Sequence, residues 1–117
     1  SEMMKLLDQI LHCLDKLREQ DANLEALRRA LNELIEDPRW DDLEDSLDLA
    51  VLSHKMALVY VIARWQSASE KQAAIYFNER AVQILAEQRL LGAAEARTWL
   101  VQAEAIQSAV LSPPAGS

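Results

Sequence analysis

The feature that most constrains the fold is the absence of helix-breaking residues over most of the chain. Residues 1–91 contain no glycine and a single proline, Pro38. Within them, residues 49–63 (LAVLSHKMALVYVIA) are apolar except for the Ser-His-Lys triplet at 53–55. A helix that is apolar almost all round must be covered on more than one side. The sequence therefore predicts a helical bundle whose central helix is wrapped by other helices, with a second chain supplying part of the cover.

The overall architecture predicted is all-α, an antiparallel bundle of four to five helices that forms a dimer. We expect one helical-bundle domain over residues 1–111 and a disordered tail at 112–117, because the chain contains no linker long enough to separate domains. The central helix is expected to span about residues 38–66. Asp37 is placed as its N-cap and Pro38 as its first residue, where the missing N–H costs nothing.

Two further helices follow from capping signals. Ser67 and Glu70 match a capping box, in which each side chain bonds the backbone N–H of the other residue. The helix that begins there is expected to reach Leu91, with Leu91 on its inner face, and Gly92 ends it in a left-handed cap. The last helix is expected over about 93–111. Its inner face is expected to carry Ala96, Trp99, Ala103, Ile106 and Val110.

The first helical stretch, residues 2–36, leaves two arrangements open. A continuous heptad stripe of apolar residues favours one long helix. A polar patch around Asp21 favours a hairpin, in which Asp21 or Asn23 caps a second helix. The apolar face is wider before this patch than after it, which tips the interpretation slightly towards the break near Asp21.

The charge pattern excludes two classes of partner. The net charge is −7, and seven acidic residues lie between positions 36 and 48. Binding to nucleic acid or to an anionic membrane depends on clustered cations, so neither partner is expected. The apolar run at 49–63 is also shorter than the roughly 20 residues that cross a bilayer.

The cysteine content and the start of the sequence predict a cytoplasmic protein. Cys13 is the single cysteine, which excludes an intrachain disulfide and suits a reducing compartment. The opening residues lack the basic and apolar regions of a signal peptide. His12 and Cys13 are adjacent, so on a helix they diverge and form neither a metal site nor a catalytic dyad. Cys13 is interpreted as a packing residue.

His54 is the one residue that suggests chemistry. Single histidines on helical bundles carry phosphoryl groups in phosphorelay proteins, and Ser53-His54 resembles the start of a sensor-kinase histidine box. The acidic residue that should follow the histidine is replaced by Lys55, and the later proline of that box is missing. A histidine packed on an apolar helix is therefore the favoured interpretation, with phosphotransfer through His54 as the alternative.

Other catalytic and cofactor motifs are missing from the sequence. There is no CxxC, HxxxH or ExxH spacing, and the acidic run lacks the glycine and closing glutamate of a calcium loop. Two glycines in the whole chain leave no phosphate-cradling loop. We therefore expect no metal, no cofactor and no enzymatic activity.

Association with another protein is the function that remains. Trp40 sits in an acidic turn beside Asp41 and Asp42 and is expected to be the most exposed aromatic residue. Met56 and Tyr60 lie on the side of the central helix away from His54, and one of these two faces is expected to need a partner surface. These five residues, Trp40, Asp41, Asp42, Met56 and Tyr60, are the predicted interaction site.

The sequence predicts a small regulator, adaptor or export chaperone that works as a homodimer with a further, unidentified protein partner. Acidic all-α proteins of this size include the chaperones of bacterial flagellar and type III export, and the segment Trp-Asp-Asp-Leu at 40–43 is similar to parts of such proteins. A third possibility, an apolar ligand held between helices, follows from the spare apolar faces.

Overall fold

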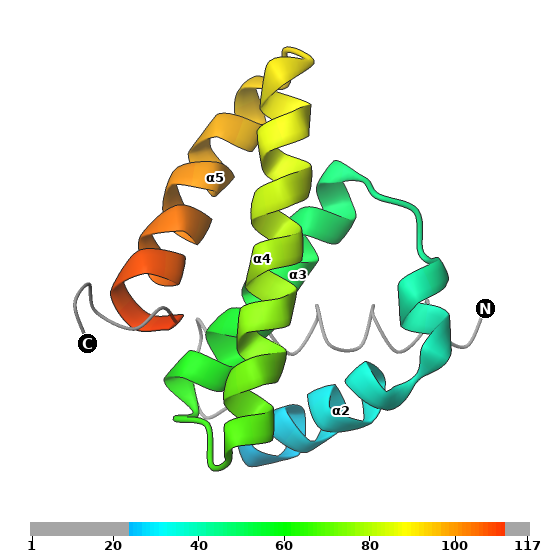
Figure 1. Cartoon of the computed structure of the whole chain (residues 1–117), viewed down its shortest axis with the longest axis vertical. Helices are drawn as coiled ribbons and strands as arrows, with labels where there is room; N and C mark the ends of the chain where they lie inside the picture. The colour runs from blue at the N-terminus through cyan, green and yellow to red at the C-terminus, as the bar shows by residue number, and fades with distance from the viewer. Residues whose placement is uncertain (1–23, 112–117) are drawn as a thin grey trace. The chain divides into compact units, whose positions relative to one another are not determined.

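The computed structural model describes residues 24–111, and every regular element in this range is helical (Figure 1). The predicted all-α class is therefore confirmed. The chain divides into two compact units, residues 1–43 and residues 44–117, and each is described by itself. One domain over 1–111 and assembly into a dimer both stay predictions, as does the disordered tail at 112–117, which lies outside the described residues.

The first unit contains the helix α2, Leu24–Glu36, which has a clear apolar stripe. Leu27, Leu31 and Leu34 are its buried leucines, and their spacing of four and three residues matches the predicted heptad pattern. The choice between one helix over residues 2–36 and a hairpin broken near Asp21 lies outside the described residues.

The short 3₁₀ helix η1, Pro38–Asp42, follows α2 directly. Asp37 caps it by accepting a hydrogen bond from the backbone N–H of Arg39 at 2.9 Å, and Pro38 occupies the first position as predicted. The helix stops after five residues, and the chain runs on without helix to the next N-cap, Ser46. The predicted central helix over 38–66 is therefore wrong at its start, because two separately capped helices occupy that range.

The second unit contains the helices α3, α4 and α5 and a π-helical turn, η2. Their bounds are Leu47–Ile62, Ala68–Leu90, Ala94–Ile106 and Gln107–Leu111. Helix α4 packs along both α3 and α5, whereas α3 and α5 contact each other more sparsely, and Figure 1 shows α4 between its neighbours in the chain. The three helices are thus connected in a simple up-and-down order.

Helix α3 is buried on more than one side, as predicted for residues 49–63, and one less buried strip runs along Val51, Lys55 and Leu58. Its hydroxyl cap is Ser46, which accepts a hydrogen bond from the N–H of Leu49 at 3.1 Å. Tyr60 from α3 and Phe77 from α4 lie nearly parallel, with ring centroids 6.5 Å apart. The buried residues of α3 are Leu49, Ala50, Leu52, Ser53, His54, Met56, Ala57, Val59 and Tyr60.

Helix α4 begins with a variant of the predicted capping box. The Ser67 hydroxyl accepts from the N–H of Glu70 at 3.2 Å, as predicted. The Glu70 carboxylate, however, accepts from the N–H of Gln66 at 2.7 Å rather than from that of Ser67. Glu70 is buried, so its carboxylate ties the turn before α4 to the helix itself.

The turn between α4 and α5 is a Schellman motif built on Gly92. This glycine has φ +94° and donates to the carbonyl of Arg89, while Ala93 donates to the carbonyl of Gln88. The predicted left-handed cap is confirmed. Ala93 is then the N-cap of α5, and it supplies no side-chain hydrogen bond to the helix.

Helix α5 ends at Ile106, five residues before the predicted end, and gives way to η2. Of the expected inner face, Ala96 and Ala103 are buried, whereas Trp99 and Ile106 are half-buried and Val110 is exposed. The π-helical turn widens the helix after Ile106, and a simple periodicity of 3.6 residues fails beyond that point.

Candidate functional site

The most distinctive polar group in the second unit is a buried network centred on His54. The ring of His54 is fully buried, and its Nδ1 lies 2.9 Å from Oδ1 of Asn78 on α4. The side-chain nitrogen of Asn78 donates to the carbonyl of Ala103 and to Oε1 of Gln107, each at 2.9 Å. Three helices and η2 are therefore joined by one asparagine.

The geometry of this network determines which ring nitrogen of His54 carries a proton. Asn78 Nδ2 uses its two hydrogens on Ala103 and Gln107, so the atom facing His54 is an acceptor. His54 Nδ1 must then be the donor, which makes the neutral ring the Nδ1–H tautomer. Its Nε2 is buried and has no hydrogen-bond partner among the described residues.

An aromatic ring from α5 lies against His54. Trp99 contacts the imidazole edge-on, with ring centroids 6.2 Å apart and planes at 65°. The ammonium group of Lys55 lies 5.6 Å from the centroid of the Trp99 ring, within range of a cation–π interaction. His54 and Lys55 of α3 therefore both contact Trp99 of α5.

The surroundings of His54 disfavour its charged form. Burial lowers the pKa of His54 below its ordinary value of 6.5, the hydrogen bond to Asn78 opposes this effect, and the positive charge of Lys55 lowers the pKa further. The neutral imidazole is the form that suits the folded protein. Phosphotransfer needs an accessible nitrogen, and neither nitrogen of His54 is accessible in this structure.

Three of the five predicted interaction residues are buried. Trp40 is 1% exposed, so the expectation that it is the most exposed aromatic residue is wrong. Met56 and Tyr60 are fully buried, as is His54 on the other side of α3. The expected wet face of α3 is therefore covered, and neither Met56 nor Tyr60 lies on a surface.

The other two predicted interaction residues, Asp41 and Asp42, are exposed on η1. The helix that carries them is fixed at its start by Arg39, whose guanidinium group lies 2.7 Å from the Asp37 carboxylate. The hydrogen bonds from the side chain and the backbone of Arg39 lower the pKa of Asp37. The acidic turn thus presents two carboxylates on a short, capped helix.

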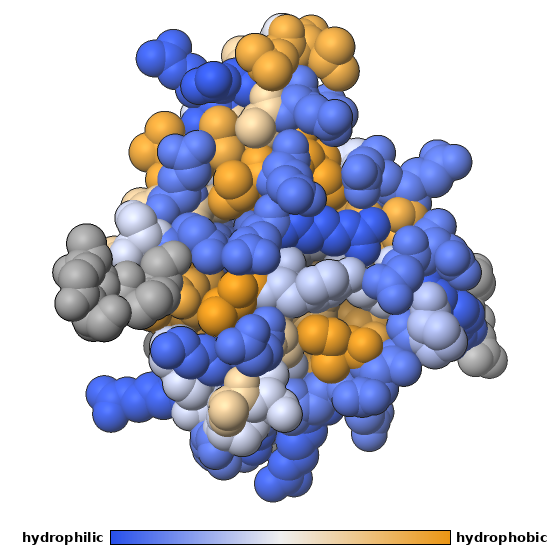
Figure 2. Space-filling view, in the orientation of Figure 1, coloured by the Kyte–Doolittle hydropathy of each residue, from blue (hydrophilic) through white to orange (hydrophobic). Residues whose placement is uncertain are grey.

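Sequence reasoning missed the largest exposed apolar residues. Leu90 and Leu91 are 79% and 80% exposed at the end of α4, so the placement of Leu91 on the inner face is wrong. Figure 2 shows apolar atoms gathered at this end of the molecule. The signal was present in the sequence, since two adjacent leucines precede Gly92, the residue that ends the helix. Ile62, Tyr76, Val101 and Val110 are also exposed.

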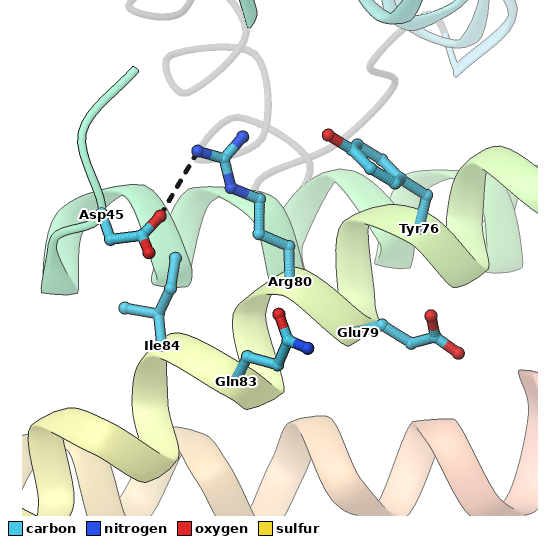
Figure 3. Close-up of a pocket in the computed structure, with 6 residues that line it drawn as sticks. All are labelled: Asp45, Tyr76, Glu79, Arg80, Gln83 and Ile84. Atoms are coloured by element: carbon cyan, nitrogen blue, oxygen red, sulfur yellow. Dashed lines mark hydrogen bonds and ion pairs between the residues drawn. The ribbon is translucent and has the colours of Figure 1, made fainter. Parts of the chain in front are cut away.

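A polar groove lies along the outer side of α4. Its volume is about 390 Å³, and Arg80 crosses it to pair with Asp45 at a distance of 3.4 Å (Figure 3). The lining residues are Asp45, Tyr76, Glu79, Arg80, Gln83 and Ile84. Four of these six side chains carry charges or amides, so this groove does not suit the apolar ligand that the sequence left as a possibility.

Residues 24–111 contain no group of three His, Cys, Asp or Glu side chains placed to hold a metal ion. His12 and Cys13 lie outside the described residues. No helix in the described range combines the length and the apolar character that crossing a membrane requires.

Comparisons with protein families, curated proteins and solved structures find no match to this chain. The function is therefore argued from the residues themselves.

Proposed function

We propose that this chain is a non-enzymatic protein–protein interaction module of the regulator, adaptor or export-chaperone type, acting in the cytoplasm as a homodimer. The observation that carries the proposal is the pair of exposed leucines, Leu90 and Leu91, at the tip of the α4–α5 hairpin. Large apolar side chains exposed together at one end of a molecule are typical of a surface that binds another protein.

The energy available at this tip is substantial. Moving one exposed leucine side chain out of water contributes about 1.5–3 kcal/mol. Leu90 and Leu91 project from a turn that the Schellman motif and Gly92 hold in a defined conformation, so binding requires little ordering of the backbone. An apolar anchor on a rigid turn is a suitable centre for an interface.

The acidic turn supplies a second feature that supports the proposal. Asp41 and Asp42 are exposed carboxylates on η1, and five more acidic residues lie between positions 36 and 48. Charge of one sign steers the approach of a partner with the opposite sign and contributes more to association rate than to affinity. A partner with basic residues would complement the acidic turn, and a partner with an apolar pocket would complement the leucines.

The experiment compares two variants that each change exposed apolar residues. Leu90→Gln/Leu91→Gln alters the hairpin tip, and Ile62→Gln alters a residue that is 55% exposed at the end of α3. Ile62 precedes the start of α4, whereas Leu90 and Leu91 lie at its end, which makes Ile62→Gln a matched control. Circular dichroism establishes that all three proteins are equally helical.

Sedimentation velocity at micromolar concentration then measures self-association. We expect the parent and Ile62→Gln to be dimers and the tip variant to be a monomer. A strictly monomeric parent contradicts the homodimer, and a tip variant that stays dimeric contradicts the assignment of Leu90 and Leu91 as the interface.

No second function is proposed. Phosphotransfer through His54 lacks an accessible ring nitrogen, and the groove along α4 is too polar to suit an apolar ligand.

A further inference from the structure

Helix α5 has a narrow apolar attachment to the rest of the second unit. Its buried residues are Ala96, Leu100 and Ala103, and two of these three are alanines, which remove little apolar area from water. Its polar and aromatic contacts include the hydrogen bond from Asn78 to the carbonyl of Ala103 and the packing of Trp99 on α3. The docking of α5 therefore depends strongly on polar and aromatic contacts.

Among residues 24–111, the groups found to act on His54 are uncharged except for one cation. Helix α3 itself contributes Lys55, whose charge acts on the imidazole. Helix α4 contributes the amide of Asn78, and α5 contributes the ring of Trp99. The turn η2 contributes the amide of Gln107, which reaches the network through Asn78. Among these groups there is no carboxylate to receive a second proton from the ring.

Protonation changes one end of the ring only. The Nδ1–H of His54 continues to donate to Asn78, while Nε2 acquires a hydrogen that has no acceptor among the described residues. A buried charged donor without a partner is costly, and water is the acceptor it can gain. Trp99 packs edge-on against the buried ring, and its displacement would open a path for water to the imidazole.

We propose that α5 together with η2 is a pH-gated arm, in which uptake of a proton at Nε2 of His54 displaces Trp99 and loosens the arm from α3 and α4. The loosened arm uncovers apolar surface of α3 and α4. This device is independent of the dimer and of the leucines at the hairpin tip.

The direction of the effect follows from the protonation of the two states. The pKa of His54 is lowered in the docked state, so the opened state binds more protons below the ordinary value of 6.5. Docking is therefore fully stable above that value. It weakens progressively as the pH falls below 6.5 and stops weakening once the docked state is protonated as well.

The test uses the full-length protein and nuclear magnetic resonance. Nitrogen-15 shifts of the imidazole ring at neutral pH give the tautomer, and we expect Nδ1–H for His54. The same shifts are followed from about pH 7.5 to about pH 4.5, a range that spans the ionisation of histidine, and they give the titration midpoint of His54. We expect this midpoint to lie below that of the same residue in denaturant.

Hydrogen exchange over the same pH range measures the opening of α5 and η2 directly. We expect the protection factors of α5 amides to fall on acidification by about tenfold if the two midpoints differ by one pH unit. An Nε2–H tautomer overturns the proposal. So does unchanged protection of α5 across the titration of His54.

Two variants separate His54 from other acid effects. His54→Phe removes the titrating ring and should make α5 protection independent of pH in this range. His12→Gln removes the other histidine and should leave the parent's response intact. A response abolished by His12→Gln overturns the proposal. If His54→Phe does not fold, the tautomer and exchange measurements on the parent still decide the matter.

Discussion

Helices α3 and α5 belong to the same unit, yet they are held in different ways. Nine of the 16 residues of α3 are buried, and they occupy all of the helix surface except one strip that carries Val51, Lys55 and Leu58. Only three of the 13 residues of α5 are buried, and Val101 on the same helix is 64% exposed. The N-cap of α3 is a hydrogen-bonded serine, whereas α5 begins at Ala93 without a side-chain cap.

This difference indicates that stability is not uniform along the second unit. Apolar burial is the main favourable term in folding, so a helix with most of its surface buried opens only when the whole unit unfolds. A helix attached by two alanines, one leucine and a polar network can open by itself. The comparison therefore predicts a rigid centre, α3 with α4, and a more easily opened arm, α5 with η2.

The largest effect is expected in α3. Met56→Ala removes a fully buried side chain and should lower the free energy of unfolding by about 2–5 kcal/mol. Val101→Ala, on the exposed side of α5, should change it by less than about 0.5 kcal/mol. Urea denaturation measures both values, and similar losses of unfolding free energy in the two variants would contradict the predicted difference between α3 and α5.

The next largest loss of stability is expected at Asn78, which hydrogen-bonds to both α5 and η2. Asn78→Ala leaves the Nδ1–H of His54 buried without its acceptor, at a cost of about 1–3 kcal/mol. The carbonyl of Ala103 loses one of its two hydrogen bonds and keeps the one from the backbone N–H of Gln107. Gln107→Ala removes a single bond from the network and should cost less, about 0.5–1.5 kcal/mol. Urea denaturation ranks the two variants, and an equal or larger loss for Gln107→Ala would show that Asn78 is not the fastening residue.

Substitutions of Gly92 test whether the turn that leads into α5 requires a left-handed backbone conformation. Its φ of +94° is unfavourable for any residue with a Cβ atom, although a Cβ placed there meets no atom within 4 Å. Gly92→Ala should therefore cost about 1–2 kcal/mol from backbone strain alone. Gly92→Asn should cost less, since asparagine tolerates a left-handed conformation better. Thermal unfolding of the two variants gives the order, and equal stability of parent and alanine variant contradicts the strained turn.

The smallest expected effect is a gain in stability at the start of α5. Ala93 has an extended backbone and no capping hydrogen bond, so Ala93→Ser should stabilise α5 by about 0.5–1 kcal/mol. The reverse change at α3, Ser46→Ala, should cost a similar amount or more, because it removes a hydrogen bond that exists. Thermal unfolding measures both variants. A loss of stability in Ala93→Ser would mean that the start of α5 is not limited by its cap.

Local signals in the sequence predicted much of the fold. The apolar run at 49–63 predicted a helix covered on more than one side, and Asp37, Ser67 and Gly92 marked caps that the structure contains. These features depend on neighbouring residues, so they can be recognised without knowledge of tertiary contacts. The break before α3 was hidden, because the acidic residues around Ser46 also suit the first turn of a longer helix.

Features that depend on distant residues could not be predicted in this way. The partner of His54 is Asn78, 24 positions further along the chain, and no local pattern links the two. The burial of Trp40 depends on tertiary packing rather than on its acidic neighbours. The exposure of Leu91 arises because apolar periodicity continues past the point where the helix ends.

Native-state hydrogen exchange at neutral pH, with low concentrations of denaturant, tests the central difference between α3 and α5 most directly. The account predicts that core amides of α3 exchange only through global unfolding, while those of α5 exchange through a local opening of lower free energy and weaker denaturant dependence. Amides of α5 that are as well protected as those of α3, with the same denaturant dependence, would contradict it.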